Sequence, residues 1–412
     1  MKILWVKAGG LVPPDLGGRI RSYHILRELA GRHRVTLFTF YAVQPNDPHA
    51  ELSQVFERVL YWPLPIATNR GLGELASFAR HVIRPWPHSV AKYCRPDVAR
   101  AMRQLLAEDV YDVLVCDFVM AAGVIPWDTP TPKVLFTHNV EAQIWQRHYQ
   151  ISRNPLWKLV CWGEYQKMMR FERLCLERSH HVLTVSEADR AFFSHFVDPR
   201  KISVIPTGVD TEYFRPAAGL ERPASLVFTG AMDWMPNEDA MLYFVRSILP
   251  MIRREVPDVE LTIAGRQPTS RLLAAVGGDR RIHVTGRVED IRPHVHHGAV
   301  YVVPLRIGGG TRLKIFEAMA MGKAIVSTRI GAEGLPVKDS THLLLADRPE
   351  DFAHKVVSLL RQPALRHRLG STARGLVEQS HSWSAVALQF ESVVQFVIRG
   401  KPITAGTLRA DG

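Results

Sequence analysis

The chain has 412 residues, of which 46% are hydrophobic and 22% are charged. This composition is typical of a globular protein and excludes a disordered, collagen-like or disulfide-scaffolded chain. The longest stretch without Asp, Glu, Lys or Arg is residues 293–305, 13 residues in all, whereas a transmembrane helix needs about 20 apolar residues. At roughly 100–200 residues per domain, the length predicts two or three domains.

The N-terminus and the cysteines predict a cytoplasmic protein. The apolar residues 3–6 are interrupted by Lys7, which leaves too short a run for the roughly 7–15-residue apolar core of a secretory signal. The four cysteines have no paired spacing. They fit reduced, buried thiols better than disulfides or a zinc site.

The charge balance predicts an anionic partner. Lys and Arg number 52 and Asp and Glu 40, giving a net charge of +12 with neutral histidine. The excess is spread over both halves of the chain, which fits nucleic acid, an anionic membrane surface or a phosphorylated ligand, with solubility alone as the simplest alternative. Because interleaved aromatic and basic motifs are missing, no nucleic-acid partner is expected.

Short β-rich runs alternate with helical patterns along the whole chain. The first series of predicted strands comprises residues 3–6, 35–40, 113–116, 134–137, 182–185 and 202–205. The second series comprises residues 226–229, 261–264, 283–285, 300–303, 324–327 and 343–345. Such alternation predicts two units, each with a parallel sheet covered by helices. A glycine- and proline-rich stretch that begins at Pro206 predicts the boundary between them.

Two further helical patterns stand out. An apolar stripe with the spacing of one helix face should be buried, and it comprises Trp383, Val386, Phe390, Val393 and Val397. Residues 155–178 combine tryptophans and methionines with lysines and arginines. We expect a helix packed within the first domain, and a helix lying on a membrane surface is the alternative.

The strongest local motif follows the predicted strand at residues 300–303. A run of three glycines, residues 308–310, leads to a helix that starts near Thr311. A turn of this kind leaves backbone N–H groups unpaired at the helix start, and the helix dipole makes that position attractive to anions. The motif therefore predicts a phosphate site.

Charged side chains in the same helix strengthen this interpretation. Arg312 and Lys314 lie in the first turn, where positive charge opposes the helix dipole, so a bound diphosphate would explain their position. Glu317, one turn after Lys314, has two carboxylate oxygens that can accept from both hydroxyls of a ribose. The alternative is a tight turn followed by a surface Lys314–Glu317 pair.

Two more candidate ligand-binding positions follow strands of the first series. The loop after the first strand contains Gly17 and Gly18 but lacks the G-x-G-x-x-G spacing, and no acidic residue ends the second strand, so a dinucleotide dehydrogenase is disfavoured. His138 follows residues 134–137 at the same predicted sheet edge. It is a candidate acid, base or hydrogen-bond donor, with a purely structural histidine as the alternative.

A metal site is not expected. Three histidines, His294, His296 and His297, lie close together before the strand at residues 300–303. Carboxylates that could orient them as ligands are missing nearby, so the end of a helix is the better interpretation.

Several motifs then match a known family. In the second half they are Ile205-Pro206-Thr207-Gly208-Val209-Asp210, Gly230, Ala264-Gly265, Gly286 and residues 308–322, and in the first half Gly17-Gly18-Arg19 and Val185-Ser186-Glu187. The chain resembles, over nearly its whole length, the family 4 glycosyltransferases of the GT-B fold. Within them it is similar to the sugar transferases of exopolysaccharide assembly and exosortase systems.

This resemblance implies an α/β GT-B fold with two Rossmann-like parallel-sheet domains facing a central cleft. Residues 1–205 would bind the acceptor and residues 206–382 the nucleotide sugar, while a C-terminal helix, residues 383–398, packs back on the first domain. The implied activity is transfer of a hexose from a nucleotide-diphosphate sugar to a saccharide or polyprenyl-linked saccharide acceptor in exopolysaccharide biosynthesis. Retention at the anomeric carbon, no cofactor or metal, and a cytoplasmic location at the inner face of an anionic membrane are also implied.

The resemblance also implies roles for residues of this chain. The donor-binding residues are Gly17, Gly18, Gly230, Gly309, Gly310, Thr311 and Glu317. Glu317 would bind the ribose, Gly310 and Thr311 the diphosphate, and His138 would sit beside the transferred sugar as a catalytic residue.

The chain departs from the family pattern at two positions. Gly309 stands where the family commonly has the first of two glutamates, and Ala231 follows Gly230 where the family tends to have an arginine. We hypothesise that Arg312 and Lys314 supply the missing positive charge and act as catalytic residues. The departures leave open a catalytically inactive nucleotide-sugar-binding or regulatory protein, and an epimerase of the same fold is a further alternative.

Overall fold

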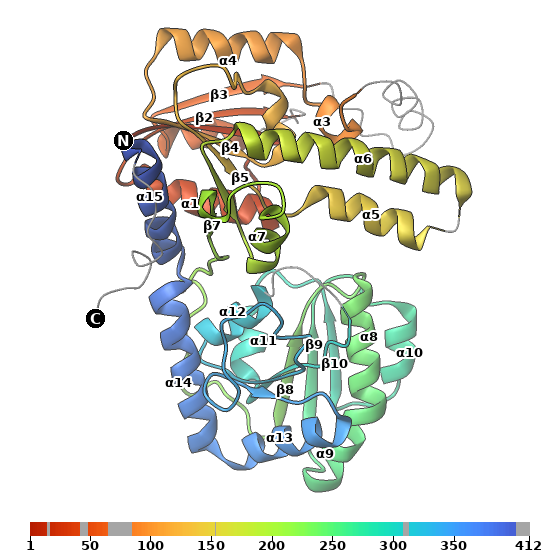
Figure 1. The fold of residues 1–412 in the computed structure, drawn as a ribbon. Helices are drawn as coiled ribbons and strands as arrows, with labels where there is room; N and C mark the ends of the chain where they lie inside the picture. Colours follow the sequence, from red (N-terminus) through yellow and green to blue (C-terminus); the bar gives the residue numbers. More distant parts are fainter. Residues whose placement is uncertain (15–16, 42–47, 65–84, 153, 308–312, 401–412) are drawn as a thin grey trace. The chain divides into compact units, whose positions relative to one another are not determined.

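The computed structural model describes residues 1–14, 17–41, 48–64, 85–152, 154–307 and 313–400 (Figure 1). The chain divides into two compact units, one formed by Met1–Pro206 with Val386–Gly412 and the other by Thr207–Ala385. Each unit contains one sheet of parallel strands. The predicted fold class, two α/β units with parallel sheets, is confirmed.

The first unit contains a seven-stranded sheet in the order β3-β2-β1-β4-β5-β6-β7. Its strands are β1 (Lys2–Ala8), β2 (Arg34–Tyr41), β3 (Arg58–Pro63), β4 (Val113–Asp117), β5 (Lys133–Phe136), β6 (His181–Thr184) and β7 (Ile202–Val204). The sequences of the central strands are nearly continuous apolar runs because helices bury both faces of a parallel sheet. The strand order reverses between β1 and β4, so the carboxyl ends of these two strands flank the switch point at which ligands bind in such sheets.

The helices of the first unit are α1 (Gly17–Ala30), α3 (His88–Ala91), α4 (Pro96–Glu108), α5 (Glu141–Ile151), α6 (Pro155–Arg178) and α7 (Glu187–Phe193). Helices α5 and α6 form a hairpin that extends beyond the strands of the unit (Figure 1). Helix α6 starts at Pro155 because the Asn154 side chain accepts hydrogen bonds from the backbone of Leu156 and Trp157. None of the described helices combines the length and apolarity that crossing a membrane requires.

The last helix, α15 (Trp383–Arg399), contributes most of its length to the first unit. Its residues Val386, Phe390 and Val393 are buried. The ring of Phe390 lies 5.2 Å from that of Trp5 and 5.4 Å from that of Phe136. This apolar contact joins the C-terminal segment to the core around β1 and β5.

The second unit contains a six-stranded sheet in the order β10-β9-β8-β11-β12-β13. Its strands are β8 (Ser225–Thr229), β9 (Glu260–Ala264), β10 (Ile282–Gly286), β11 (Val300–Val303), β12 (Ala324–Ser327) and β13 (Leu344–Leu345). Its helices are α8 (Met235–Tyr243), α9 (Leu249–Glu255), α10 (Ser270–Val276), α11 (Arg292–His297), α12 (Leu313–Ala320), α13 (Pro349–Arg361) and α14 (Pro363–Ser380). Here the switch point lies between β8 and β11.

Candidate functional site

A buried polar network lies at the carboxyl ends of β1 and β4 in the first unit. One carboxylate oxygen of Asp117, Oδ2, accepts from Lys7 Nζ at 2.9 Å and from Trp5 Nε1 at 2.8 Å. The other, Oδ1, lies 2.6 Å from His138 Nε2. Lys7 also donates to Ser22 Oγ at 2.9 Å. The network therefore connects β1, β4 and α1 with His138, two residues after the end of β5.

The surroundings of His138 determine its protonation. Burial by itself would raise the pKa of Asp117, but Lys7 and His138 outweigh it and hold that pKa well below its usual range. Burial lowers the pKa of His138 to about 4, although Asp117 opposes this shift. His138 is therefore neutral at pH 7.

The two partners of the imidazole then assign its tautomer. An ionised carboxylate only accepts hydrogen bonds and a guanidinium only donates them. Nε2 of His138 therefore carries the hydrogen and donates it to Asp117, while Nδ1 accepts from Arg21 Nη1 at 2.8 Å. Both ring nitrogens are thus bonded within the first unit.

The predicted glycines of the first unit lie at the same edge of the sheet. Gly17 and Gly18 form the start of α1, and a Cβ built on Gly18 would lie 3.8 Å from the His138 ring. We did not identify Lys7, Asp117 or Arg21 from the sequence. The available signal was a Lys and an Asp at the ends of otherwise apolar strands, where a buried charge needs a partner.

A second group of candidate residues lies at the carboxyl end of β8 in the second unit. Lys314, in the first turn of α12, donates from Nζ to Asn237 Oδ1 at 2.7 Å and lies 4.2 Å from the ring centroid of Phe228. A Cβ built on Gly230 would lie 2.6 Å from Asn237 Nδ2 and 2.8 Å from Lys314 Nζ. The missing side chain at Gly230 is what allows the ammonium group to approach the end of β8.

Glu317 follows Lys314 by one turn of α12 and is half-buried. Burial raises the pKa of Glu317 to about 7, and Lys314 opposes the shift. The Glu317 carboxyl group therefore ionises near neutral pH. The structure brings Lys314 together with Gly230 and with Asn237, which the sequence did not single out, and it places Glu317 one turn further along α12. The predicted residues Gly309, Gly310, Thr311 and Arg312 lie outside the described residues.

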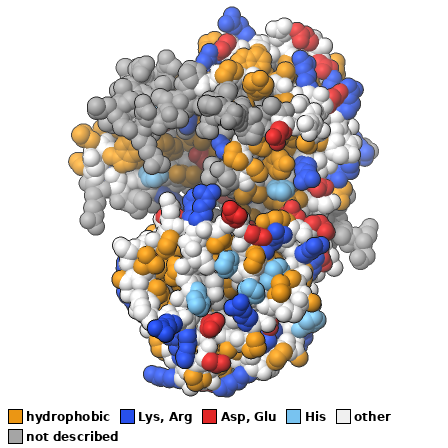
Figure 2. Space-filling model, turned by 180° about the vertical axis from the view of Figure 1, so that it is seen from behind, with side chains coloured by type: hydrophobic (Ala, Val, Ile, Leu, Met, Phe, Trp, Pro, Cys, Tyr) orange, Lys and Arg blue, Asp and Glu red, His pale blue; other side chains and the backbone are white. Residues whose placement is uncertain are grey.

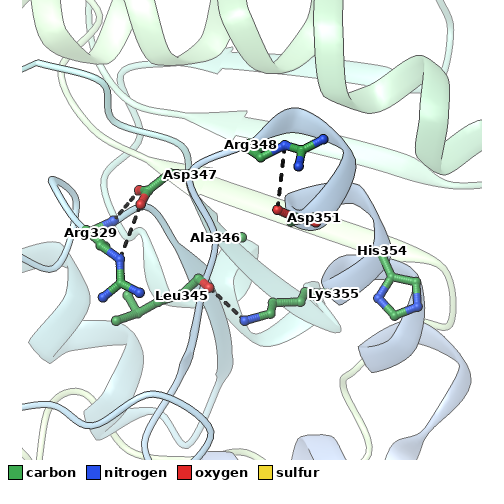
Figure 3. A pocket seen from close by; sticks show the side chains of 8 residues that line it. All are labelled: Arg329, Leu345, Ala346, Asp347, Arg348, Asp351, His354 and Lys355. Atoms are coloured by element: carbon green, nitrogen blue, oxygen red, sulfur yellow. Dashed lines mark hydrogen bonds and ion pairs between the residues drawn. The ribbon is translucent and has the colours of Figure 1, made fainter.

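A cavity of about 330 Å³ lies elsewhere in the second unit, at the carboxyl ends of β12 and β13 (Figure 3). It is lined by Arg329, Leu345, Ala346, Asp347, Arg348, Asp351, His354 and Lys355. The backbone N of Arg329 donates to Asp347 Oδ1 at 2.8 Å, and Arg329 Nε lies 3.3 Å from Asp347 Oδ2 (Figure 3). Lys355 Nζ donates to the carbonyl of Leu345 at 2.7 Å. None of the candidate donor-binding residues lines this cavity, and these cations have partners within the unit, so we do not include it in the site.

The three predicted histidines His294, His296 and His297 lie at the end of α11. Over the described ranges of the chain, no group of three or more His, Cys, Asp or Glu side chains is arranged to hold a metal ion.

Two family models match the chain. The model described as Glycosyltransferase Family 4 matches residues 17–213, and the model described as Glycosyl transferases group 1 matches residues 223–362. One lies almost entirely in the first unit and the other in the second. Together they cover most of the sequence.

Curated relatives agree with these models. The chain is 20% identical over 393 residues to a 44.6 kDa protein in the cps region of Klebsiella pneumoniae, covering 92% of this chain and 96% of that protein. It is 25% identical over 263 residues to the MMP α-(1→4)-mannosyltransferase of Mycolicibacterium hassiacum, covering 61% of this chain. The chain spans 62% of that enzyme's length, and about half to three fifths of the length of several other relatives.

Solved structures share the fold. Sucrose-phosphate synthase from Thermosynechococcus elongatus matches with a TM-score of 0.70 at 19% identity. The match covers 97% of this chain and 100% of the synthase chain. HepE from Anabaena, in complex with UDP and glucose, matches with a TM-score of 0.65 at 15% identity, covering 96% of this chain and 100% of the other. With the two family models, these matches show that the protein belongs to the family 4 glycosyltransferases, and that it is a hexosyltransferase-type enzyme with the GT-B fold.

Proposed function

We propose that this glycosyltransferase moves a hexose from a nucleotide-diphosphate sugar to a saccharide or polyprenyl-linked saccharide acceptor during exopolysaccharide assembly. The observation that carries the proposal is the position of the Lys314 ammonium beside Gly230 at the switch point of the second unit. Glu317 lies one turn further along the same helix. In this proposal the Lys314 ammonium binds the diphosphate, and the Glu317 carboxylate, one turn further along α12, binds the ribose.

The chemistry of the departing group explains why cations matter here. A pyrophosphate that leaves a sugar accumulates negative charge, and preorganised charge and N–H donors stabilise that charge more effectively than a strong base does. Lys314, Arg312 and the backbone N–H groups at the start of α12 supply such stabilisation. With these groups, the proposed reaction needs neither a cofactor nor a metal ion.

The state of His138 bears on the acceptor side of the reaction. With a pKa of about 4 and both ring nitrogens already bonded, His138 is a poor base at pH 7. We therefore assign the acceptor's proton to the leaving phosphate, with retention at the anomeric carbon. The immobilised ring of His138 would pack beside the transferred sugar. Gly17 and Gly18, which have no side chains, would leave room for the diphosphate.

The relatives support the donor class and the setting. Structures of HepE from Anabaena contain UDP or UDP-glucose, and the relative from Klebsiella pneumoniae is named for a cps region. The net charge of +12 fits an enzyme that works at the inner face of an anionic membrane, where a polyprenyl-linked acceptor would be presented.

A panel of nucleotide sugars tested for thermal stabilisation examines the proposal directly. A true donor at 100 times its dissociation constant stabilises the fold by about 2.7 kcal/mol. The stabilising sugar is then incubated with polyprenyl-linked oligosaccharides, and transfer is measured. If no nucleotide sugar stabilises the protein, the proposal is wrong. Binding without transfer or hydrolysis would favour an inactive binding protein, and conversion of the donor without any acceptor would favour an epimerase.

A further inference from the structure

The far end of the α5–α6 hairpin exposes large apolar side chains. Leu156 is 76% exposed, Leu159 66% and Trp162 49%. Their spacing of three residues places them on one face of α6. Tyr149 on α5 and Trp157 are also exposed, at 37% and 36%. Hydrophobic side chains are visible at the left of Figure 2, where the half-turn brings this end of the hairpin.

The base of the hairpin is firmly held within the first unit. The carboxylate of Glu172 on α6 accepts from the backbone N of Glu141 at 2.8 Å and of Ala142 at 3.1 Å, which satisfies the start of α5. Glu164 accepts from the backbone N of His88 at 2.7 Å. The far end of the hairpin therefore belongs to two helices that hydrogen bonds hold within the first unit, and not to a loop.

The ionisable side chains around the apolar end are mostly basic. Between residues 142 and 170 the sequence contains a single acidic residue, Glu164, and this residue is only 4% exposed. Arg147 and Arg170 are exposed, and the Lys158 ammonium lies 5.3 Å from the centroid of the Tyr149 ring. Positive charge thus borders the exposed apolar side chains.

We propose that this end of the hairpin, the apolar tip formed by Tyr149, Leu156, Trp157, Leu159 and Trp162, docks in the interfacial region of a bilayer that contains anionic phospholipids. Tryptophan and tyrosine favour the boundary between headgroups and acyl chains, and leucines enter below it. Each basic residue near an anionic surface strengthens binding about fivefold. An acidic or polar protein surface would match the charges but would leave the leucines exposed.

This inference deepens the proposed function, because it names the surface that would bring the enzyme to a membrane-bound acceptor. Membrane docking does not require transfer, and nucleotide-sugar binding does not require lipid. Sedimentation of the full chain with phosphatidylcholine vesicles, with and without about 30% phosphatidylglycerol, therefore tests the tip separately. Calorimetry with a nucleotide sugar, performed on the same preparations, tests the proposed donor site.

The variant Leu156→Ser/Leu159→Ser/Trp162→Ser removes the apolar contact at exposed positions, so the fold should persist. The matched control Val110→Ser/Leu388→Ser changes side chains that are 86% and 53% exposed elsewhere in the first unit. We expect the triple variant to lose at least tenfold in partitioning to anionic vesicles, and the control to stay within twofold. Nucleotide-sugar affinity should not change in either protein.

A charge pair of variants tests the second part of the proposal. Lys158→Glu/Arg170→Glu should abolish the preference for anionic vesicles, whereas Arg58→Glu/Arg100→Glu, which makes the same change of charge elsewhere in the unit, should preserve it. An environment-sensitive fluorophore attached at Leu159→Cys should shift to the blue on binding, and one at Val110→Cys should not, with the unaltered chain as a labelling control.

Three results would overturn the proposal. One is the absence of binding to anionic vesicles, and another is binding that the triple serine variant retains in full. The third is a protein that is dimeric in solution and becomes monomeric in the triple variant without change in vesicle binding, since a second copy of the chain would then cover the tip.

Discussion

The imidazole of His138 donates to the carboxylate of Asp117 across 2.6 Å, and both side chains are buried in the first unit. The same carboxylate pairs with Lys7 at 2.9 Å. Because Asp117 holds the imidazole from one side and Arg21 from the other, the ring has one orientation and one tautomer. Asp117 is therefore a positioning residue for His138.

Asp117→Asn should lower both turnover and stability. The amide cannot neutralise Lys7, and removing one partner of a buried ion pair costs about 3 kcal/mol of unfolding free energy. We expect kcat to fall at least tenfold, with donor affinity within threefold, when transfer, calorimetry and urea unfolding are measured together. Asp128→Asn, which removes an exposed ion pair with Arg103, is the control. It should change neither kcat nor the unfolding free energy appreciably. Unaltered kcat in Asp117→Asn would contradict the positioning role.

His138→Ala should reduce turnover while leaving nucleotide-sugar affinity within a few-fold. In the proposed function the donor binds to the second unit, whereas His138 lies at the sheet edge of the first unit. Steady-state kinetics and calorimetry separate the two effects. An equal loss of affinity and turnover would show that His138 contributes to donor binding instead.

Arg312→Ala/Lys314→Ala should weaken nucleotide-sugar binding at least tenfold, which corresponds to about 1.4 kcal/mol. Both cations are proposed to neutralise the donor diphosphate. Arg306→Ala, which removes a cation six residues before Arg312 in the sequence that pairs with Asp239, should bind nearly as tightly as the unaltered protein. Calorimetric affinities that do not differ between the double variant and the unaltered chain would refute this assignment.

Donor affinity should rise with pH between pH 6 and pH 8. The pKa of Glu317 is raised to about 7, so raising the pH increases the ionised fraction that can accept from the ribose hydroxyls. A change from mostly protonated to mostly ionised carboxylate should strengthen binding of UDP-glucose about tenfold. Glu317→Gln should bind weakly and without this pH dependence. A flat profile in the unaltered protein would exclude ribose binding by Glu317.

Gly230→Ala should weaken donor binding by displacing Lys314. The added methyl group would lie 2.8 Å from Lys314 Nζ and 2.6 Å from Asn237 Nδ2, so both side chains must move. We expect a loss of affinity of at least fivefold and a loss of about 1–3 kcal/mol in unfolding free energy. In the control Gly163→Ala, inside helix α6, the new methyl group meets no atom within 4 Å. Donor affinity should be preserved there, and the unfolding free energy should stay the same or rise by up to about 1 kcal/mol because alanine favours a helix interior.

Much of the fold could be predicted because the central strands are buried on both faces and therefore appear as apolar runs. The strand β3 was missed although residues 59–62 are all apolar; it lies at the edge of its sheet and is only partly buried. The helix with Lys314 and Glu317 was predicted because a strand, a glycine turn and charged residues lie next to one another in the sequence. Local order was enough to identify that side of the candidate site.

By itself, the sequence determined two parallel-sheet units and the position of His138 after a strand, and it predicted a phosphate-type motif at residues 308–312. Only the tertiary structure decided the partners of these residues. Asp117 meets Lys7 across 110 positions and Lys314 meets Asn237 across 77 positions of the chain. Strand order brings such groups to one sheet edge, and strand order depends on long-range packing that no local pattern encodes. Burial then sets the charge of His138 and the ionisation of Glu317, because only the folded protein removes water from these groups.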